Sequence, residues 1–216
     1  MRDSFADIAA LAEADLTAQP RAYSDAMRHA YQEDKDLSAA MAIAWAGISR
    51  LLALAHVSAP EQAVELRSQA LILSYDLASF TWAGWDEPGI VITPPEARAG
   101  CAAARANLAL TKELEKGELT RSRAHWLLGA HELAAGRPDD ARPNFETAAT
   151  LARAAGSEGA SEAKLARAFV ALTDLAAGAA AEADLSSALD ELRRDPDGAV
   201  LVEQVKTARA ALDIDP

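Results

Sequence analysis

The chain has 216 residues, of which 50% are hydrophobic but only 5% aromatic, and its formal net charge is -12. This excess of acids excludes the broad basic surface that binding to nucleic acids or anionic membranes requires, so we expect neither as a partner. Alanine, the strongest helix former, supplies about a quarter of the residues. Because β-branched residues are also scarce outside residues 81–95, the composition favours an all-α protein.

Helix start and stop signals divide the chain into ten predicted helices joined by short connections. Pro20, Pro60 and Gly136 each mark such a boundary, and Asp195-Pro196-Asp197-Gly198 is a strong stop signal. Short connections make consecutive helices antiparallel neighbours. The predicted helices cover residues 3–18, 21–32, 37–57, 60–81, 94–117, 119–135, 139–155, 160–177, 181–194 and 199–212.

Two features of the N-terminal part bear on location. The first residues, MRDSFADIAALAEADL, carry several acids, so we do not expect a secretory signal. Residues 37–57 are the most apolar stretch, but Ser49, Arg50 and His56 interrupt them, which favours a buried helix over a membrane span.

With Cys101 as the only cysteine, no intrachain disulfide can form. We expect a cytoplasmic protein, and the Ala and Arg bias suggests a bacterial source.

One segment, TWAGWDEPGIVITPP at residues 81–95, does not follow the helical pattern. Three interpretations remain open for it. Trp82, Trp85 and the Ile-Val-Ile run can anchor the segment on the helices, or they can form a recognition element. The adjacent Asp86 and Glu87 are a weak candidate for acid/base catalysis, which needs carboxyl groups placed on both sides of a substrate.

A repeat is visible in HWLLGAHELAAGRPDDARPNFETA, residues 125–148, where a Leu128-Gly129 pair is followed by spaced Ala141, Phe145 and Ala148. This pattern resembles a tetratricopeptide (TPR) repeat, although Trp126 stands one residue nearer to Leu-Gly than usual. In that repeat the glycine lets the second helix lie against the first. A lengthened second unit follows, with Val170-Ala171 in place of Leu-Gly.

The resemblance implies one TPR-like domain over residues 1–216, a right-handed superhelical stack of antiparallel helix pairs. Its repeats are clearest over 119–194, residues 82–94 are a loop insertion, and 198–214 form a polar-faced capping helix. A further first helix, SYDLASFTWAG, is suggested before the insertion, and its second helix after the insertion would place Ala97, Cys101 and Ala104 in the interface. The repeat phase before residue 66 stays open.

In TPR proteins the first helices line a concave groove that binds peptides. The resemblance therefore implies a non-catalytic scaffold for a protein or peptide partner, and a homo-oligomer is left open. The groove-facing side would continue along Leu165, Ala168 and Leu172. The residues that we expect to contact a partner are Tyr75, Ser79, Trp82, Trp85, Arg123, Trp126 and Leu133.

No enzyme, nucleotide or metal motif is present, so we expect neither catalysis nor a cofactor. His125 and His131 fall on different helix faces, and His125 with Glu132 alone is no metal site. We expect Cys101 to be a small core residue. The alternative to a scaffold is a regulatory module that binds a small ligand. A closed pocket beneath Trp82 and Trp85 would favour that alternative, and an open groove would favour the scaffold.

Overall fold

The computed structural model describes residues 4–13, 15 and 21–214, and every regular element in these ranges is helical. Two short 3-10 helices accompany the α-helices: η1 (Ala83–Trp85) and η2 (Gly156–Gly159). The α-helices are α1 (Ser4–Glu13), α2 (Ala22–Gln32), α3 (Leu37–Val57), α4 (Pro60–Phe80), α5 (Pro94–Glu113), α6 (Glu118–Ala134), α7 (Pro138–Ala154), α8 (Ala160–Ala176), α9 (Glu182–Arg193) and α10 (Gly198–Ala211).

The all-α prediction is confirmed, and the predicted helices match the observed ones closely. The fifth helix is a correction, because α5 ends at Glu113 rather than at Gly117. Leu114 caps it, and Glu115 turns the chain away with a left-handed φ of 46°. The end predicted for the first helix, near residue 18, lies outside the described residues.

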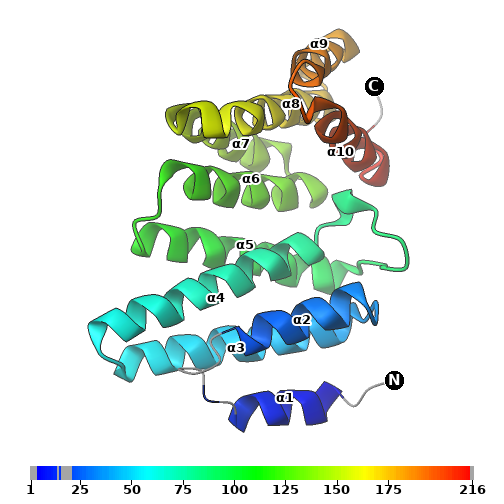
Figure 1. The fold of residues 1–216 in the computed structure, drawn as a ribbon. Helices are drawn as coiled ribbons and strands as arrows, with labels where there is room; N and C mark the ends of the chain where they lie inside the picture. Colours follow the sequence, from blue (N-terminus) through cyan, green and yellow to red (C-terminus); the bar gives the residue numbers. More distant parts are fainter. Residues whose placement is uncertain (1–3, 14, 16–20, 215–216) are drawn as a thin grey trace.

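From α2 onward consecutive helices pack against each other, and α1 packs on α3, so the chain rises in layers from α1 to α9 (Figure 1). Alternate helices also touch, since α2 contacts α4, α4 contacts α6 and α8 contacts α10. One contact breaks the sequential order: α10 lies against η1, which belongs to the connection between α4 and α5. The final helix therefore returns to the middle of the protein.

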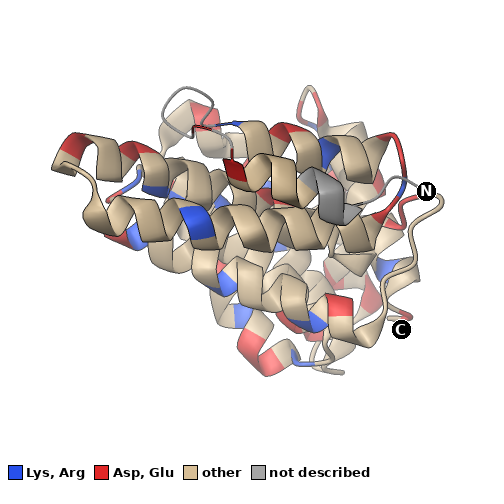
Figure 2. Ribbon diagram, turned by 90° about the horizontal axis from the view of Figure 1, so that it is seen from below, with Lys and Arg blue, Asp and Glu red and all other residues tan. Residues whose placement is uncertain are grey.

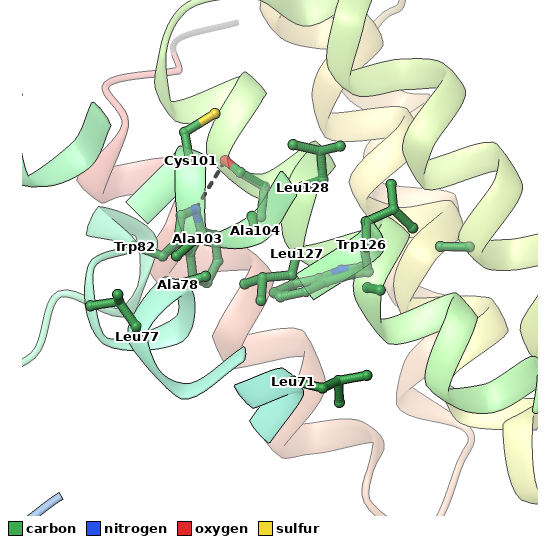
Figure 3. Close-up of a cluster of buried hydrophobic side chains, with 14 of the residues drawn as sticks. Leu71, Leu77, Ala78, Trp82, Cys101, Ala103, Ala104, Trp126, Leu127 and Leu128 are labelled. Carbon is green, nitrogen blue, oxygen red and sulfur yellow. Dashed lines mark hydrogen bonds between the residues drawn. The ribbon is translucent and has the colours of Figure 1, made fainter. Parts of the chain in front are cut away.

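The core forms one cluster that includes residues of α2 to α10 and consists mainly of alanine and leucine; Figure 3 shows a part of it around Trp82 and Trp126. Small residues allow neighbouring helices to approach closely. Gly129 on α6 is an example, because a Cβ there would lie 3.2 Å from the Ala141 carbonyl oxygen and from the Phe145 ring. Ala141, Phe145 and Ala148 are all fully buried. The packing predicted for this helix pair is thus confirmed.

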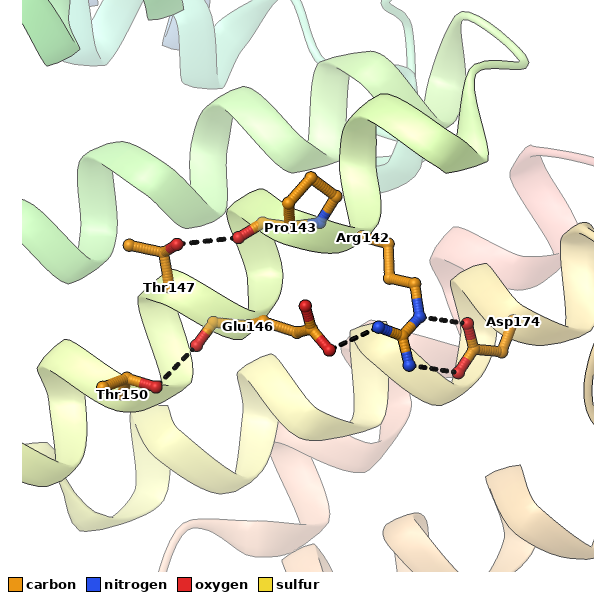
Figure 4. Close-up of polar contacts among 6 residues, drawn as sticks. All are labelled: Arg142, Pro143, Glu146, Thr147, Thr150 and Asp174. Carbon is orange, nitrogen blue, oxygen red and sulfur yellow. Dashed lines mark hydrogen bonds and ion pairs between the residues drawn. The ribbon is translucent and has the colours of Figure 1, made fainter.

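On the solvent side of α7, polar contacts continue to α8 (Figure 4). Arg142 Nε donates to Asp174 on α8 at 2.7 Å, and the same guanidinium pairs with Glu146 one turn along α7. Pro143 lies inside α7, and its carbonyl accepts from the Thr147 hydroxyl at 2.8 Å. These groups are exposed, so they orient the two helices more than they stabilise them.

Helix α3 is the one helix in the described ranges that is long and apolar enough to cross a membrane, with a mean hydropathy of 1.6 over its best window. In this structure nine of its residues are buried, and it packs between α2 and α4. Its assignment as a soluble core helix stays a prediction.

Charged residues of both signs alternate along the helices seen in Figure 2. Seven of the fifteen described ion pairs join different helices, as with Arg28 of α2 and Asp76 of α4 at 2.6 Å. Acids outnumber bases by 33 to 21 over the chain. The net charge is therefore distributed over many elements.

Gly100 provides a direct test of close helix approach. A Cβ on this α5 residue would lie 2.1 Å from the Thr81 hydroxyl oxygen and 2.6 Å from the His131 ring. We predict that Gly100→Ala lowers the free energy of unfolding by about 1–3 kcal/mol, although alanine is the better helix former by about 1 kcal/mol. Urea denaturation measures the change. Gly117→Ala is the matched control, because no atom lies within 4 Å of its Cβ position. An equal effect at both sites would contradict the packing argument.

Candidate functional site

Trp82 anchors the connection between α4 and α5 in the core. Its side chain is only 1% exposed, and its indole N–H donates to the Ala130 carbonyl of α6 at 3.1 Å (Figure 3). It also packs edge-to-face on Trp85 and Trp126, with ring centroids 4.9 and 5.3 Å apart. A buried indole with a satisfied N–H is a strong point of attachment.

The rest of the connection is attached as well. The indole N–H of Trp85 donates to the Ser79 carbonyl at 2.9 Å, and Ile90 and Ile92 pack on the core. Val91 between them is 82% exposed. Of the interpretations left open by the sequence, anchoring on the helices is therefore observed for both tryptophans and both isoleucines.

The adjacent acids of this connection do not face a common site. Asp86 is exposed and adopts a left-handed φ of 48° at the end of η1. Glu87 pairs with Lys35 at 2.8 Å, which joins the connection to the turn before α3. This arrangement lacks the two opposed carboxyl groups that acid/base catalysis on one substrate requires.

Five aromatic rings form one cluster behind these contacts. Trp126 packs edge-to-face on Phe169 with centroids 5.1 Å apart, and Phe145 stacks on Phe169 at 5.2 Å. Such pairs favour offset or edge-to-face geometry over a face-to-face sandwich. The cluster, which we call the aromatic cluster, consists of Trp82, Trp85, Trp126, Phe145 and Phe169.

A cavity of about 220 Å³ adjoins the aromatic cluster, and we call it the inner cavity. Side chains from α4, η1, α6, α8 and α10 surround it. Its volume is below the roughly 300–1,000 Å³ of most small-molecule pockets. The residues that line it are Tyr75, Trp85, Ser122, Arg123, Trp126, Glu162, Leu165, Leu201 and Gln204.

Polar groups in the inner cavity are partly satisfied. The Arg123 guanidinium donates to Glu162 through Nε at 3.0 Å and Nη2 at 2.6 Å, and this hydrogen bond raises the pKa of Arg123 further. Burial raises the pKa of Tyr75, so its hydroxyl stays protonated. The indole N–H of Trp126 is buried and has no acceptor among the described residues. An acceptor on a bound molecule would satisfy it.

The structure brings together four of the seven residues predicted to contact a partner. Tyr75, Trp85, Arg123 and Trp126 line the inner cavity, together with the predicted Leu165. Ser79 is half-buried and uses its carbonyl to hold Trp85.

The partner-facing placement of two further predicted residues is corrected. Trp82 is 1% and Leu133 is 5% exposed, so neither side chain is presented to a partner in this conformation. Ala168 and Leu172, predicted to continue the groove, are likewise fully buried. The physical reason is the same for all four, because their side chains pack in the hydrophobic core between the helices.

The sequence did not indicate where α10 lies. We expected a cap at the end of the stack, but α10 packs on both α8 and η1 and contributes Leu201 and Gln204 to the inner cavity. Val202, Val205 and Ala208 form its buried side. Their spacing of three residues was the signal that this helix has one apolar face.

The two histidines of α6, His125 and His131, have specific partners. His131 is 3% exposed and donates from Nε2 to the Ala78 carbonyl at 2.8 Å, and burial lowers its pKa to about 4. His125 contacts the Asn144 side chain at 2.9 Å, and Asn144 donates to Glu132 at 2.8 Å. These contacts give both imidazoles structural roles between helices.

Within the described part of the chain, no group of three His, Cys, Asp or Glu side chains is placed to hold a metal ion. Cys101 is buried, as expected for a core residue. No protein-family model, curated protein or solved structure matches this chain.

His131 makes stability depend on pH. Because its pKa is about 4 in the folded protein and about 6.5 when unfolded, the unfolded state binds the extra proton as the pH falls below 6.5. We predict that wild type loses about 2 kcal/mol more unfolding free energy than His131→Gln between about pH 7.5 and about pH 5. Urea denaturation at both pH values measures this. The exposed His29→Gln variant should follow wild type, and parallel pH profiles for wild type and His131→Gln would contradict the assignment.

Proposed function

We propose that this protein is a non-catalytic scaffold of TPR-like architecture that binds an amphipathic helix of a protein partner. The observation that carries the proposal is the position of α10, which lies across η1 and α8 and closes the inner cavity. This is the side on which the resemblance predicts partner binding. An amphipathic helix laid in an apolar groove is a common mode of peptide recognition.

The contacts of α10 describe the partner that would fit. Val202 and Val205 are 2% and 1% exposed, whereas Val200 on the same helix is 72% exposed. The partner helix would therefore carry small apolar residues at intervals of three or four, as α10 does. Arg123 with Glu162, and the unpaired N–H of Trp126, supply polar groups at the floor of the site.

In this proposal α10 occupies the site until a partner replaces it. A tethered helix competes at a high effective concentration, so a partner must bind well to displace it. The alternative, a small-ligand module with its pocket beneath Trp82 and Trp85, has less support. The space beside Trp85 measures about 220 Å³, and α10 already forms one of its walls.

The test displaces α10 from its site with a substitution and then adds the same helix as a separate peptide. A labelled peptide of residues 198–214 should bind Val205→Asp at least about tenfold more tightly than wild type, because the charged residue keeps the tethered helix out of the site. Fluorescence anisotropy measures the binding. The matched control is Val200→Asp, which changes an exposed residue of the same helix and should behave like wild type.

Two further variants define the site. Arg123→Glu in the Val205→Asp background should weaken peptide binding, and a peptide that itself carries Val205→Asp should not bind. Circular dichroism must show that the Val205→Asp protein keeps its helical content. Folded Val205→Asp protein that ignores the peptide, or cooperative unfolding caused by this substitution, would contradict the proposal.

A further inference from the structure

A second, larger cavity lies apart from α8 and α10. It measures about 720 Å³, within the range of pockets that hold drug-sized molecules. The end of α4, the anchored connection, α5 and the end of α6 enclose it. We call it the arginine cavity, because Arg98, Arg105 and Arg137 all line it.

The charge of the arginine cavity is opposite to that of the chain. Its lining contains three arginines and no Asp or Glu, whereas the whole sequence has 33 acids and 21 bases. The nearest acids pair with these arginines only at long range. Arg105 lies 3.8 Å from Glu132, and Arg137 lies 3.8 Å from Asp140.

No described carboxylate accepts a hydrogen bond from Nε or Nη2 of the Arg137 guanidinium. Its Nε–H is buried and has no acceptor among the described residues, and its Nη2 reaches only the Cys101 sulfur at 3.7 Å. A thiol is a weak acceptor, so it replaces little of the hydration that a buried guanidinium N–H loses.

In three other arginines of this protein, Nε and Nη2 both donate to a carboxylate. Arg28, Arg123 and Arg142 each direct both Nε and Nη2 to one carboxylate on a neighbouring helix. This geometry gives two charge-assisted hydrogen bonds and is the reason that arginine recognises carboxylates well. Arg137 lines the arginine cavity, and no described carboxylate accepts from this edge of its guanidinium.

The remaining lining is apolar. Ile92, Pro94, Ala97 and Ala134 contribute to it, and none of the lining residues is an acid. His131 also lines the cavity, and burial lowers its pKa to about 4, so it is uncharged at neutral pH. An apolar chamber with a few placed polar groups is the usual form of a small-molecule site.

We propose that the arginine cavity binds an organic carboxylate with an apolar body. The carboxylate accepts from the Arg137 guanidinium where it lines the cavity, and the apolar body contacts Ile92, Ala97 and Ala134. Arg98 and Arg105 add positive potential around the anion. The inference does not rest on the helix-binding proposal, because none of the lining residues belongs to α8 or α10.

The first test is calorimetric titration of the full chain with decanoate as the probe. Decanoate should bind saturably, and decanol and decyltrimethylammonium should bind at least about tenfold more weakly, because they lack the charge that the arginines recognise. Inorganic phosphate should also bind more weakly, because it lacks the apolar body. Equal affinity for decanol or for phosphate, or no saturable binding of decanoate, would overturn the proposal.

Variants then locate the site. Arg137→Lys keeps the positive charge but removes the two-donor edge, so decanoate binding should weaken about tenfold. The matched control is Arg193→Lys on α9, which should bind like wild type. Ala134→Leu fills the apolar wall and should also weaken binding. Wild-type affinity in both Arg137→Lys and Ala134→Leu would overturn the assignment.

Alkylation of Cys101 measures binding at the arginine cavity without calorimetry. It is the only cysteine and lines the arginine cavity. Saturating decanoate should slow its alkylation by iodoacetamide about tenfold, as expected when a bound molecule covers the thiol, and decyltrimethylammonium should not. An unchanged alkylation rate with decanoate bound would place the ligand elsewhere and overturn the proposal.

Discussion

The burial of Trp82 is the interaction on which the centre of the protein depends. Its indole N–H holds the Ala130 carbonyl of α6, and its ring contacts Trp85, Trp126 and Phe169. One side chain thereby joins the end of α4 to α6 and α8. Residues close to Trp82 in the chain line both cavities. Trp85 lines the inner cavity, and Thr81 and Ala83 line the arginine cavity.

Close contacts between the helices depend on glycine and alanine as much as on large side chains. At Gly129 and Gly100 an added Cβ would lie closer to atoms of neighbouring segments than ordinary van der Waals contact allows. Alanine and leucine fill most of the remaining interface. The aromatic cluster adds large rigid side chains where α4, η1, α6, α7 and α8 meet.

Local signals in the sequence predicted the helices well, because Pro, Gly and capping residues act within a few positions of where they stand. The Gly129 contact was also predictable, since it follows from a short pattern. The position of α10 and the burial of Trp82 and Leu133 were not, because both depend on contacts between segments far apart in the chain. The unpaired edge of Arg137 needs the same long-range information, since arginines look alike in a sequence.

The contact of α10 with η1 has a consequence for how the chain unfolds. In a stack of helices that touch only their neighbours, each end can open independently, and stability is roughly a sum over adjacent pairs. Here the last helix packs on η1, a segment near the middle, as well as on α8 and α9, so loss of α8 or α9 would also weaken the contact between α10 and η1. The C-terminal half should therefore exchange its amide hydrogens as one cooperative unit. The contact between η1 and α10 joins residues far apart in the chain, so forming it should also make the C-terminal half slow to fold.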